Sequence, residues 1–432
     1  MSENALIFLV FGLFAVLLLA RVPVAFCLAL SAFAYCFTAG VPALVVAQKV
    51  AVQMSDTTLL AIPFFILCGE IMSVGGMAQR LIALAGVCVG FLRGGLAMVN
   101  VLASMFFGGI SGSSVADTSS IGSLMIPMMV RKGYARDFSV AVTVTSSTQG
   151  IIVPPSHNAI LYSLAAGGTV SIQALFLAGY VPGVLIAVAL MAVSYGMARQ
   201  RGYPAEDLVP LPKAMGIVLT AIPAVITPLV ILVPIILGKI PPHQAAVVAV
   251  LWSALVSTFG YRSLPIARYG DILRRASRTS GMVLILIGTA AAFGEVMTYL
   301  HVPARLTQAL TSLGASPVVL LLLINLLLLA LGAMMDMAPL IVITTPILLP
   351  VVTELGMDPV HFGIVLLLNL GIGLCTPPVG STLFVGCALG KITMEEAFRG
   401  LLPFYVAMVV ILLLVTFVPE ISLALPRWVS SG

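Results

Sequence analysis

Residues 373–382 read GLCTPPVGST, and residues 150–159 read GIIVPPSHNA. Each stretch places a glycine four residues before a Pro-Pro pair, inside a long apolar segment. Proline has no N–H, and its ring clashes with the carbonyl four residues earlier, so a helix that reaches either pair is expected to break. Two breaks of the same kind in one chain predict two copies of one folding unit.

The composition indicates an all-α polytopic membrane protein. Hydrophobic residues make up 61% of the 432 residues and charged residues only 8%, with a mean hydropathy of +1.19. Apolar runs recur from Ala5 to Leu425, which excludes a soluble domain with one anchor. The first run has no basic flank and no cleavage site, so we expect a retained helix. The six cysteines form no CxxC pair, which argues against a zinc site or a disulfide framework.

An internal repeat supports the two copies. Upstream, GEIMS at 69–73 aligns with GEVMT at 294–298 after a shift of 225 residues. Downstream, a shift of 223 superimposes glycines and prolines: Pro127 on Pro350, Gly133 on Gly356, Gly150 on Gly373, Pro154 on Pro377, Pro155 on Pro378 and Gly167 on Gly390. Such matches predict duplicated units.

The distribution of charge predicts that the copies have opposite orientations. Two apolar spans between the copies end at a basic segment, 262–278, with five Arg against one Asp. An excess of Arg marks the cytoplasmic side, and counting back places the N-terminus in the periplasm. The turns of the first copy carry mainly basic residues and those of the second copy do not: Arg80, Arg93, Arg131, Lys132 and Arg136 against Arg305, Glu354 and Asp358. Inverted-topology repeats are typical of alternating-access transporters.

A re-entrant helical hairpin is expected before each break. In the segment of about 95–130, the middle, GGISGSSVADTSS, is too polar and Gly-rich for a lipid-facing helix. The second copy repeats the pattern at about 315–353 around GAMMDMAP, with Gly332 aligned to Gly109. The hairpin tips and helix breaks together predict helix ends near the bilayer midplane. Helix N-termini favour an anionic substrate there, and unwound carbonyls favour a small hard cation.

The prolines are expected to free four carbonyls, those of Gly150, Ile151, Gly373 and Leu374. A bare carbonyl in lipid is costly, so each needs a protein group, water or an ion. The alternative is an ordinary proline kink whose carbonyl is satisfied by a neighbouring Ser or Thr.

Charged residues at membrane depth also have two interpretations. Asp117 and Asp336 flank the hairpin tips, where a carboxylate is either functional or a helix cap. Glu70 and Glu295 recur in both copies, which favours an architectural role. The basic segment 262–278 is either a lipid-surface helix or a linker, and positive-inside bias suffices to explain it.

Three motifs resemble the large membrane subunit of TRAP (tripartite ATP-independent periplasmic) transporters, of the DctM type: GGISGSSVADTSSIG, GIIVPPSHNAILY and GIGLCTPPVGSTLFVG. The resemblance implies a sodium-driven importer in the bacterial inner membrane, with at least two Na⁺ and no organic cofactor. It implies an elevator-type transport domain on a scaffold, a separate small four-helix membrane subunit, and a periplasmic binding protein that delivers an organic acid. No nucleic-acid partner is expected, and membrane lipid surrounds the chain.

The expected organisation follows from the repeat and the resemblance. It comprises N-terminal scaffold helices at 1–57, repeat 1 at 58–198 with its broken helix at about 138–167, cytoplasmic linkers and scaffold helices at 199–280, repeat 2 at 281–425 with its broken helix at about 359–390, and a tail at 426–432.

The resemblance also implies ligands for two sodium sites. The first would use Ser111, Ser113, Gly150, Val153 and Pro155, and the second Gly332, Gly373, Thr376 and Pro378. Substrate contacts should lie where the copies differ, because one substrate cannot obey a pseudo-twofold axis. They are predicted to be Ser114, Gln149, Ser156, His157 and Asn158, with a structural hydrogen bond across the break as the alternative for His157.

Two other classes of function remain as alternatives. A related ion-coupled carboxylate transporter that works without a binding protein fits the repeat equally well. An intramembrane enzyme is disfavoured, because the sequence holds no HExxH, no GxSxG and no suitably spaced aspartate pair. The substrate is left open among C4-dicarboxylates, keto acids, sugar acids and sialic acids.

Overall fold

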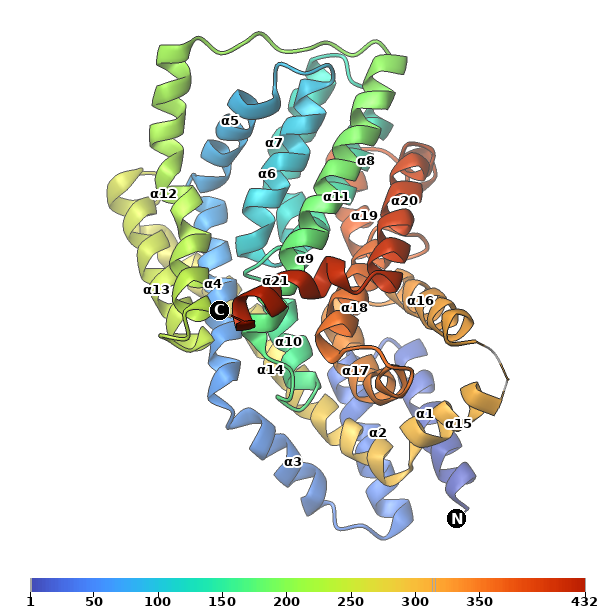
Figure 1. Cartoon of the computed structure of the whole chain (residues 1–432). Coiled ribbons are helices and arrows are strands. Elements are labelled where there is room, and N and C mark those ends of the chain that lie inside the picture. Colours follow the sequence, from blue (N-terminus) through green and yellow to red (C-terminus); the bar gives the residue numbers. More distant parts are fainter. Residues whose placement is uncertain (1, 313, 315, 432) are drawn as a thin grey trace.

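The computed structural model describes residues 2–312, 314 and 316–431, and the main elements of this part are helices joined by connecting segments (Figure 1). No strand forms among these residues, apart from a single antiparallel bridge between Arg93 and Ala205. Eight described helices are long and apolar enough to cross a membrane: Thr57–Val74, Ile172–Gln200, Leu211–Ile236, Pro242–Gly260, Ile266–Tyr299, Pro317–Met334, Met337–Glu354 and Met394–Phe417. The expected fold class, an all-α polytopic membrane protein, is confirmed.

One group of helices is linked by contacts that run through α14 and α13, and we call it the flanking helices. They are α1 (Glu3–Leu19), α2 (Val24–Ala39), α3 (Leu44–Met54), the short η1 (Thr57–Leu60), α4 (Ala61–Val74), α12 (Leu211–Ile236), α13 (Pro242–Leu255) with its π-helical end (Val256–Gly260), η3 (Ile266–Arg268) and α14 (Tyr269–Tyr299). The first part of the basic segment 262–278 connects α13 to α14 and includes η3, and its second part, from Tyr269, forms the start of the long α14, which continues into the apolar part of the chain.

The remaining long helices form a second group, which we call the central unit. It comprises α6 (Gly95–Ser111), α7 (Ser114–Arg131), α8 (Arg136–Ser147), α9 (Gln149–Ile152), α10 (His157–Ala165), α11 (Ile172–Gln200), α16 (Pro317–Met334), α17 (Met337–Glu354), α18 (Pro359–Gly373), α19 (Ser381–Gly390), α20 (Met394–Phe417) and α21 (Glu420–Ser431). The pairs α6–α7 and α16–α17 are the two expected hairpins. The breaks fall at Val153–Ser156 and 374–380, as the Pro-Pro pairs predicted.

Two short helices connect the groups. The helix α5 (Met77–Val89) packs against α6 of the central unit and α12 of the flanking helices. The helix α15 (Val302–Ser312) packs against α17 and α14. Their first residues, 77 and 302, differ by the upstream repeat shift of 225, so equivalent helices of the two copies join the two groups.

The two broken helices run in opposite directions. At one end, Arg136 at the start of α8 donates to the carbonyl of Gly390 at the end of α19 (Nη1 to O, 3.4 Å). At the other end, the Tyr162 hydroxyl of α10 donates to the carbonyl of Pro359 at the start of α18 (2.6 Å). The start of each broken helix therefore lies beside the end of the other.

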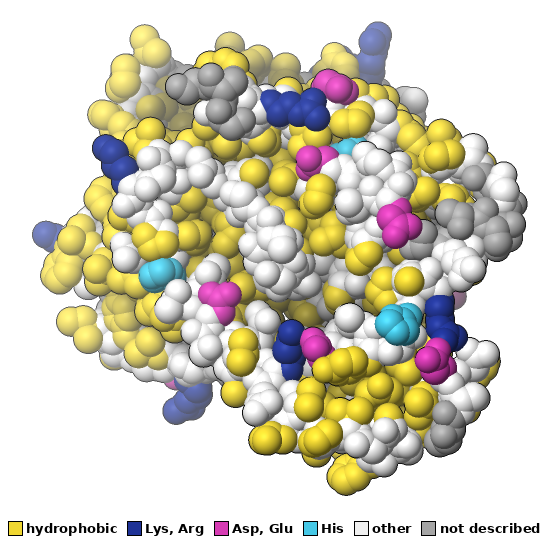
Figure 2. Space-filling view, turned by 60° about the horizontal axis from the view of Figure 1, so that its bottom comes forward, with side chains coloured by type: hydrophobic (Ala, Val, Ile, Leu, Met, Phe, Trp, Pro, Cys, Tyr) yellow, Lys and Arg dark blue, Asp and Glu magenta, His cyan; other side chains and the backbone are white. Residues whose placement is uncertain are grey.

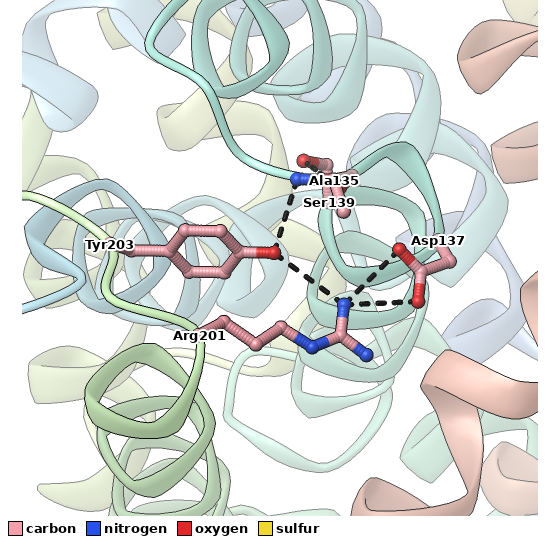
Figure 3. A network of polar contacts seen from close by, with 5 residues as sticks. All are labelled: Ala135, Asp137, Ser139, Arg201 and Tyr203. Carbon is pink, nitrogen blue, oxygen red and sulfur yellow. Dashed lines mark hydrogen bonds and ion pairs between the residues drawn. The ribbon is translucent and has the colours of Figure 1, made fainter.

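A polar cluster fixes the segment after α11 to the start of α8 (Figure 3). The Arg201 guanidinium contacts both carboxylate oxygens of Asp137 at 3.2 and 3.0 Å. The Tyr203 hydroxyl accepts a hydrogen bond from the Ala135 N–H at 3.1 Å. The connection to α12 therefore leaves the central unit only beyond these residues.

The surface of the flanking helices is apolar. Large hydrophobic side chains are strongly exposed there, for example Phe8 (79%), Phe37 (80%) and Leu219 (59%). Figure 2 shows a largely hydrophobic or uncharged face on which the charged side chains are scattered, several of them as neighbouring acidic and basic groups. This distribution suits a chain whose solvent is mostly lipid.

Candidate functional site

The tip of the first hairpin lies directly against the first helix break. The helix α6 ends at Ser111, and Gly112 has a φ of +62°, in the left-handed region that favours glycine. Ser113 caps α7, because its hydroxyl oxygen accepts a hydrogen bond from the Ala116 N–H. The Asn158 side chain, just after the break, donates to the Gly112 carbonyl over 2.6 Å.

Glycines bring each hairpin into backbone contact with its break. A Cβ on Gly150 would lie 2.5 Å from the Cα of Gly108, and a Cβ on Gly373 would lie 2.5 Å from the Cα of Gly332. The two units therefore make the same contact. The helix bounds agree with the expected alignment of Gly332 with Gly109, because α6 and α16 end at 111 and 334 and α7 and α17 begin at 114 and 337, both at a shift of 223. Gly108, one residue earlier, makes the contact that corresponds to that of Gly332.

The carbonyls at the first break have specific partners. The Ile151 carbonyl, which was expected to need a protein group, water or an ion, accepts a hydrogen bond from the Ser156 hydroxyl at 2.6 Å. The alternative, a neighbouring serine, holds there. The carbonyl oxygens of Pro154 and Val153 are directed at the hairpin, 3.0 and 3.5 Å from where a Cβ of Gly109 would lie.

At the second break, the chain supplies its own donors. The Gly373 carbonyl accepts from the Thr376 N–H (2.8 Å), and the Leu374 carbonyl accepts from the Thr382 N–H (3.2 Å). Both carbonyls therefore have protein donors: Thr376 lies just before the Pro-Pro pair, and Thr382 lies after it, where the chain has turned back. The Thr376 hydroxyl donates to the Ile372 carbonyl (2.8 Å), which leaves its oxygen lone pairs available.

The residues predicted to bind sodium fall into two separate places. Ser111, Ser113, Gly150, Val153 and Pro155 gather at the first hairpin and break, and Gly332, Gly373, Thr376 and Pro378 gather at the second. Their donors are carbonyl and hydroxyl oxygens, and a carbonyl oxygen that accepts one hydrogen bond keeps a second lone pair. Neutral oxygen donors suit a small hard cation. Within the described residues, no group of three His, Cys, Asp or Glu could hold a transition metal.

A cavity of about 530 Å³ lies between the two hairpin tips and the flanking helices α4 and α14. Three helices of the central unit begin at its wall: α7 at Ser114, α10 at His157 and α17 at Met337. Each helix N-terminus carries the positive end of the helix dipole. Ser113 and Asp336 already cap α7 and α17, whereas α10 has no side-chain cap and presents free N–H groups. The cavity is therefore suited to an anionic group.

The structure separates the five predicted substrate contacts. Ser114, His157 and Asn158 line the cavity, and the Ser114 hydroxyl is hydrogen-bonded to that of Thr382 at 2.7 Å. Gln149 is fully buried behind the wall, and its side-chain amide has no hydrogen-bond partner among the described residues. Ser156 is also behind the wall, where its hydroxyl binds the Ile151 carbonyl.

The cavity wall includes polar residues that the sequence did not single out for it. The flanking helices contribute Glu70, Ser73, Arg275 and Thr279. Glu70 and Arg275 form an ion pair, with Oε2 and Nε 3.1 Å apart. The recurrence of Glu70 in both copies was a signal, but nothing local to Arg275 distinguishes it from other arginines of the basic segment.

The two aspartates near the tips behave differently. Asp336 caps α17, because its carboxylate accepts from the Met337 N–H at 2.9 Å, and it also lines the cavity. Asp117 does not cap α7, since Ser113 occupies that position. The Asp117 carboxylate is fully buried, and neither oxygen has a hydrogen-bond partner among the described residues.

Comparisons with known proteins agree with this architecture. The solved structure of the Alcanivorax borkumensis YdaH transporter, described as having an unusual topology, superimposes with a TM-score of 0.56 over 88% of this chain and 90% of that one, at 16% identity. This likeness shows the fold alone.

Sequence relatives define the family. The C4-dicarboxylate TRAP transporter large permease protein DctM of Pseudomonas aeruginosa is 39% identical over 88% of this chain and 90% of its own length. The isethionate TRAP transporter permease protein DctMQ of Oleidesulfovibrio alaskensis is 40% identical over 96% of this chain, which spans 65% of that protein.

A family match covers nearly the whole chain. Residues 11–421 match the family described as "Tripartite ATP-independent periplasmic transporter, DctM component". The matched range includes both hairpins, both breaks and the cavity wall. The chain is therefore a transporter component rather than an enzyme, and it belongs to the DctM family of large membrane components of tripartite ATP-independent periplasmic transporters.

Proposed function

We propose that this chain is the large membrane subunit of a sodium-coupled importer that moves an organic acid across the bacterial inner membrane. One observation carries the proposal: three helix N-termini and Arg275 converge on a single cavity beside two oxygen-rich helix breaks. A carboxylate would bind the N–H groups and the positive charge. A C4-dicarboxylate and isethionate, the anions named for two relatives, both fit this chemistry.

Sodium supplies the driving force in this proposal. The hairpin and break of each unit would hold one ion through the neutral oxygens described above, which gives at least two ions per cycle. A carboxylate and a cation bound side by side also reduce each other's cost of leaving water. That mutual stabilisation would couple the substrate to the ions, because each binds best when the other is present.

Alternating access would be of the elevator type. The central unit would move as a transport domain against the flanking helices as a scaffold, with α5 and α15 as the connections. The antiparallel contacts of Arg136 with Gly390 and of Tyr162 with Pro359 support an inverted repeat, which gives one unit two related orientations.

The partners follow from the family. We infer a periplasmic binding protein that delivers the substrate, and a small four-helix membrane subunit as a separate chain. The apolar surface of the flanking helices would face this subunit and lipid. The N-terminus would lie in the periplasm, since the basic segment 262–278 would be cytoplasmic.

Uptake into proteoliposomes tests the function. The chain, reconstituted with its small subunit, is expected to accumulate succinate, isethionate or sialic acid only with an inward sodium gradient and added cognate binding protein. Uptake that needs sodium but no binding protein would favour the alternative, an ion-coupled carboxylate transporter that works alone. Uptake that survives removal of both would contradict the proposal.

A distance measurement tests the elevator. Spin labels at exposed Leu219 of α12 and exposed Phe384 of α19 would span the two groups, after exposed Cys88 is replaced by serine. We expect this distance to take two values whose populations change when sodium and substrate are added. A control pair within the flanking helices, Leu219 and Leu251, should keep one value. A single distance across the groups under all conditions would refute the elevator.

A further inference from the structure

Two ion pairs occupy positions that are related by the repeat. Glu70 of the first copy pairs with Arg275 (3.1 Å), and Glu295 of the second pairs with Lys49 (2.9 Å). The glutamates are related by a shift of 225 (70 to 295) and the basic residues by a shift of 226 (49 to 275). Lys49 lies just before the first copy and Arg275 just before the second, and each pairs with the glutamate of the copy that it does not precede, as in a twofold interface.

Each ion pair lines its own cavity. Arg275 and Glu70 line the cavity of about 530 Å³ described above. Lys49 and Glu295 line a cavity of about 320 Å³, whose other walls come from α10 and α17 of the central unit. Both cavities thus lie between flanking helices and the central unit. Arg275 and Lys49 are the sole basic Lys or Arg side chains among the described residues that line their respective cavities.

These pairs are poorly placed to act as rigid braces. The side chains of Arg275 and Glu70 are 55% and 30% exposed, and those of Lys49 and Glu295 are 43% and 30% exposed. Ion pairs this open to solvent contribute little to stability, because water and salt screen them. The same openness lets a soluble anion compete with the glutamate for the basic group.

The geometry at Arg275 leaves room for that exchange. The contact with Glu70 runs through Nε, and a guanidinium carries further N–H donors arranged for a carboxylate. The wall opposite Arg275 is formed by the tips of both hairpins, where α7 and α17 begin, and by the first helix break, where α10 begins. An anion held by those N-termini therefore faces the guanidinium across the cavity.

We propose that Arg275 and Lys49 are substrate-binding residues of the flanking helices, one for each side of the membrane. The acid group of the substrate displaces Glu70 from Arg275 when the hairpin tips face the larger cavity, as in this structure. It displaces Glu295 from Lys49 when the central unit has moved to the other side. The displaced glutamate returns when the substrate leaves, so it competes with the substrate and speeds release. The inference rests on the proposed function, since it requires an anionic substrate.

Substituting Arg275 and Glu70 separately distinguishes displacement of Glu70 by the substrate from a purely structural role of the ion pair. The test uses the purified complex with its small subunit and whichever of succinate, isethionate or sialic acid the wild-type complex transports. Arg275→Gln is expected to raise the dissociation constant at least about tenfold, the effect of losing a charge-assisted hydrogen bond. Glu70→Gln is expected to lower it, because the competitor is gone. Arg274→Gln removes the same charge from the same helix outside the cavity wall, and it should leave binding unchanged.

The opposite signs make the inference falsifiable. If the ion pair is only structural, Arg275→Gln and Glu70→Gln should weaken substrate binding equally and should lower the unfolding temperature equally. This result would overturn the proposal. Equal binding by Arg275→Gln and Arg274→Gln, with uptake by the wild type intact, would also overturn it and leave the proposed function standing. A wild-type complex that takes up none of the three acids would instead refute the proposed function, and the inference with it.

The second pair gives an independent check on the opposite side. Because the basic segment that contains Arg275 is proposed to be cytoplasmic, we assign Arg275 to the cytoplasmic side and Lys49 to the periplasmic side. Lys49→Gln should then raise the concentration of loaded binding protein needed for half-maximal uptake, and Glu295→Gln should lower it. Arg275→Gln should change that concentration less than Lys49→Gln does, because the two residues act on different sides. The reverse order would contradict the assignment of sides.

Discussion

Replacing Gly150 by alanine is expected to separate the first hairpin from its helix break. The added Cβ would lie 2.5 Å from the Cα of Gly108 and 2.9 Å from its carbonyl oxygen. Both neighbours are backbone atoms, so no side chain can rotate away to relieve the overlap. Either α6 or the chain at the helix break must therefore move, and both changes displace the oxygens proposed to bind sodium.

The size of the effect follows from the overlap. Ordinary contacts of a Cβ begin at roughly 3.4 Å, so the backbone must shift by about 1 Å, and forcing an extra methyl into a packed interior costs about 1–3 kcal/mol. If sodium binds only the packed form, the apparent affinity falls by the same free energy. That corresponds to a loss of about 5- to 150-fold.

Thermal unfolding of the purified complex, titrated with sodium chloride against potassium chloride, measures this affinity. Gly373→Ala, whose Cβ would lie 2.5 Å from Gly332, is expected to behave like Gly150→Ala. Gly86→Ala, in α5, is the matched control because nothing lies within 4 Å of its added Cβ. Sodium titrations of Gly150→Ala that coincide with those of Gly86→Ala would refute the reasoning.

Three further predictions concern single side chains. Ser156→Ala leaves the Ile151 carbonyl without its donor and should lower the free energy of unfolding by about 1–3 kcal/mol; a stability unchanged from wild type would contradict the hydrogen bond. Thr376→Val should weaken sodium binding, whereas Thr376→Ser should retain it; equal affinities would exclude the hydroxyl as a ligand. Arg201→Gln breaks the ion pair with Asp137 (Figure 3), but this pair is partly exposed, so the loss of stability should stay within about 1 kcal/mol, and a larger loss in a denaturation series would be inconsistent with it.

The hairpins and breaks could be predicted from the sequence because their causes are local. A missing N–H at Pro154 or Pro377 interrupts a helix whatever surrounds it. A polar, glycine-rich tip between two apolar segments likewise predicts a hairpin from the local sequence alone. The bounds of the hairpins also agree with the expectation. The first hairpin, expected at about 95–130, occupies Gly95–Arg131, and the second, expected at about 315–353, occupies Pro317–Glu354. Residue 315, at the start of that second range, lies outside the described residues.

The partners of the freed carbonyls could not be predicted. Whether the Leu374 carbonyl meets an ion or an N–H depends on how the chain turns after Pro378, and the N–H of Thr382 reaches it only through that turn.

Contacts between residues far apart in the sequence could not be predicted for a different reason. Arg275 and Glu70 meet because α14 packs against α4, and nothing near Arg275 in the sequence distinguishes it from Arg274. The burial of Gln149 behind the cavity wall likewise depends on how the helices pack, since periodicity does not distinguish the cavity side of a helix wholly surrounded by protein.

Locating bound sodium is the most direct test of the idea that the duplicated helix breaks are ion sites. Experimental maps of the complex in sodium and in potassium should differ at two positions, one against the hairpin tip beside Val153 and Pro155 and one beside Thr376 and Pro378. Sodium found away from both breaks, or maps that do not differ between the two salts while uptake still requires sodium, would contradict it.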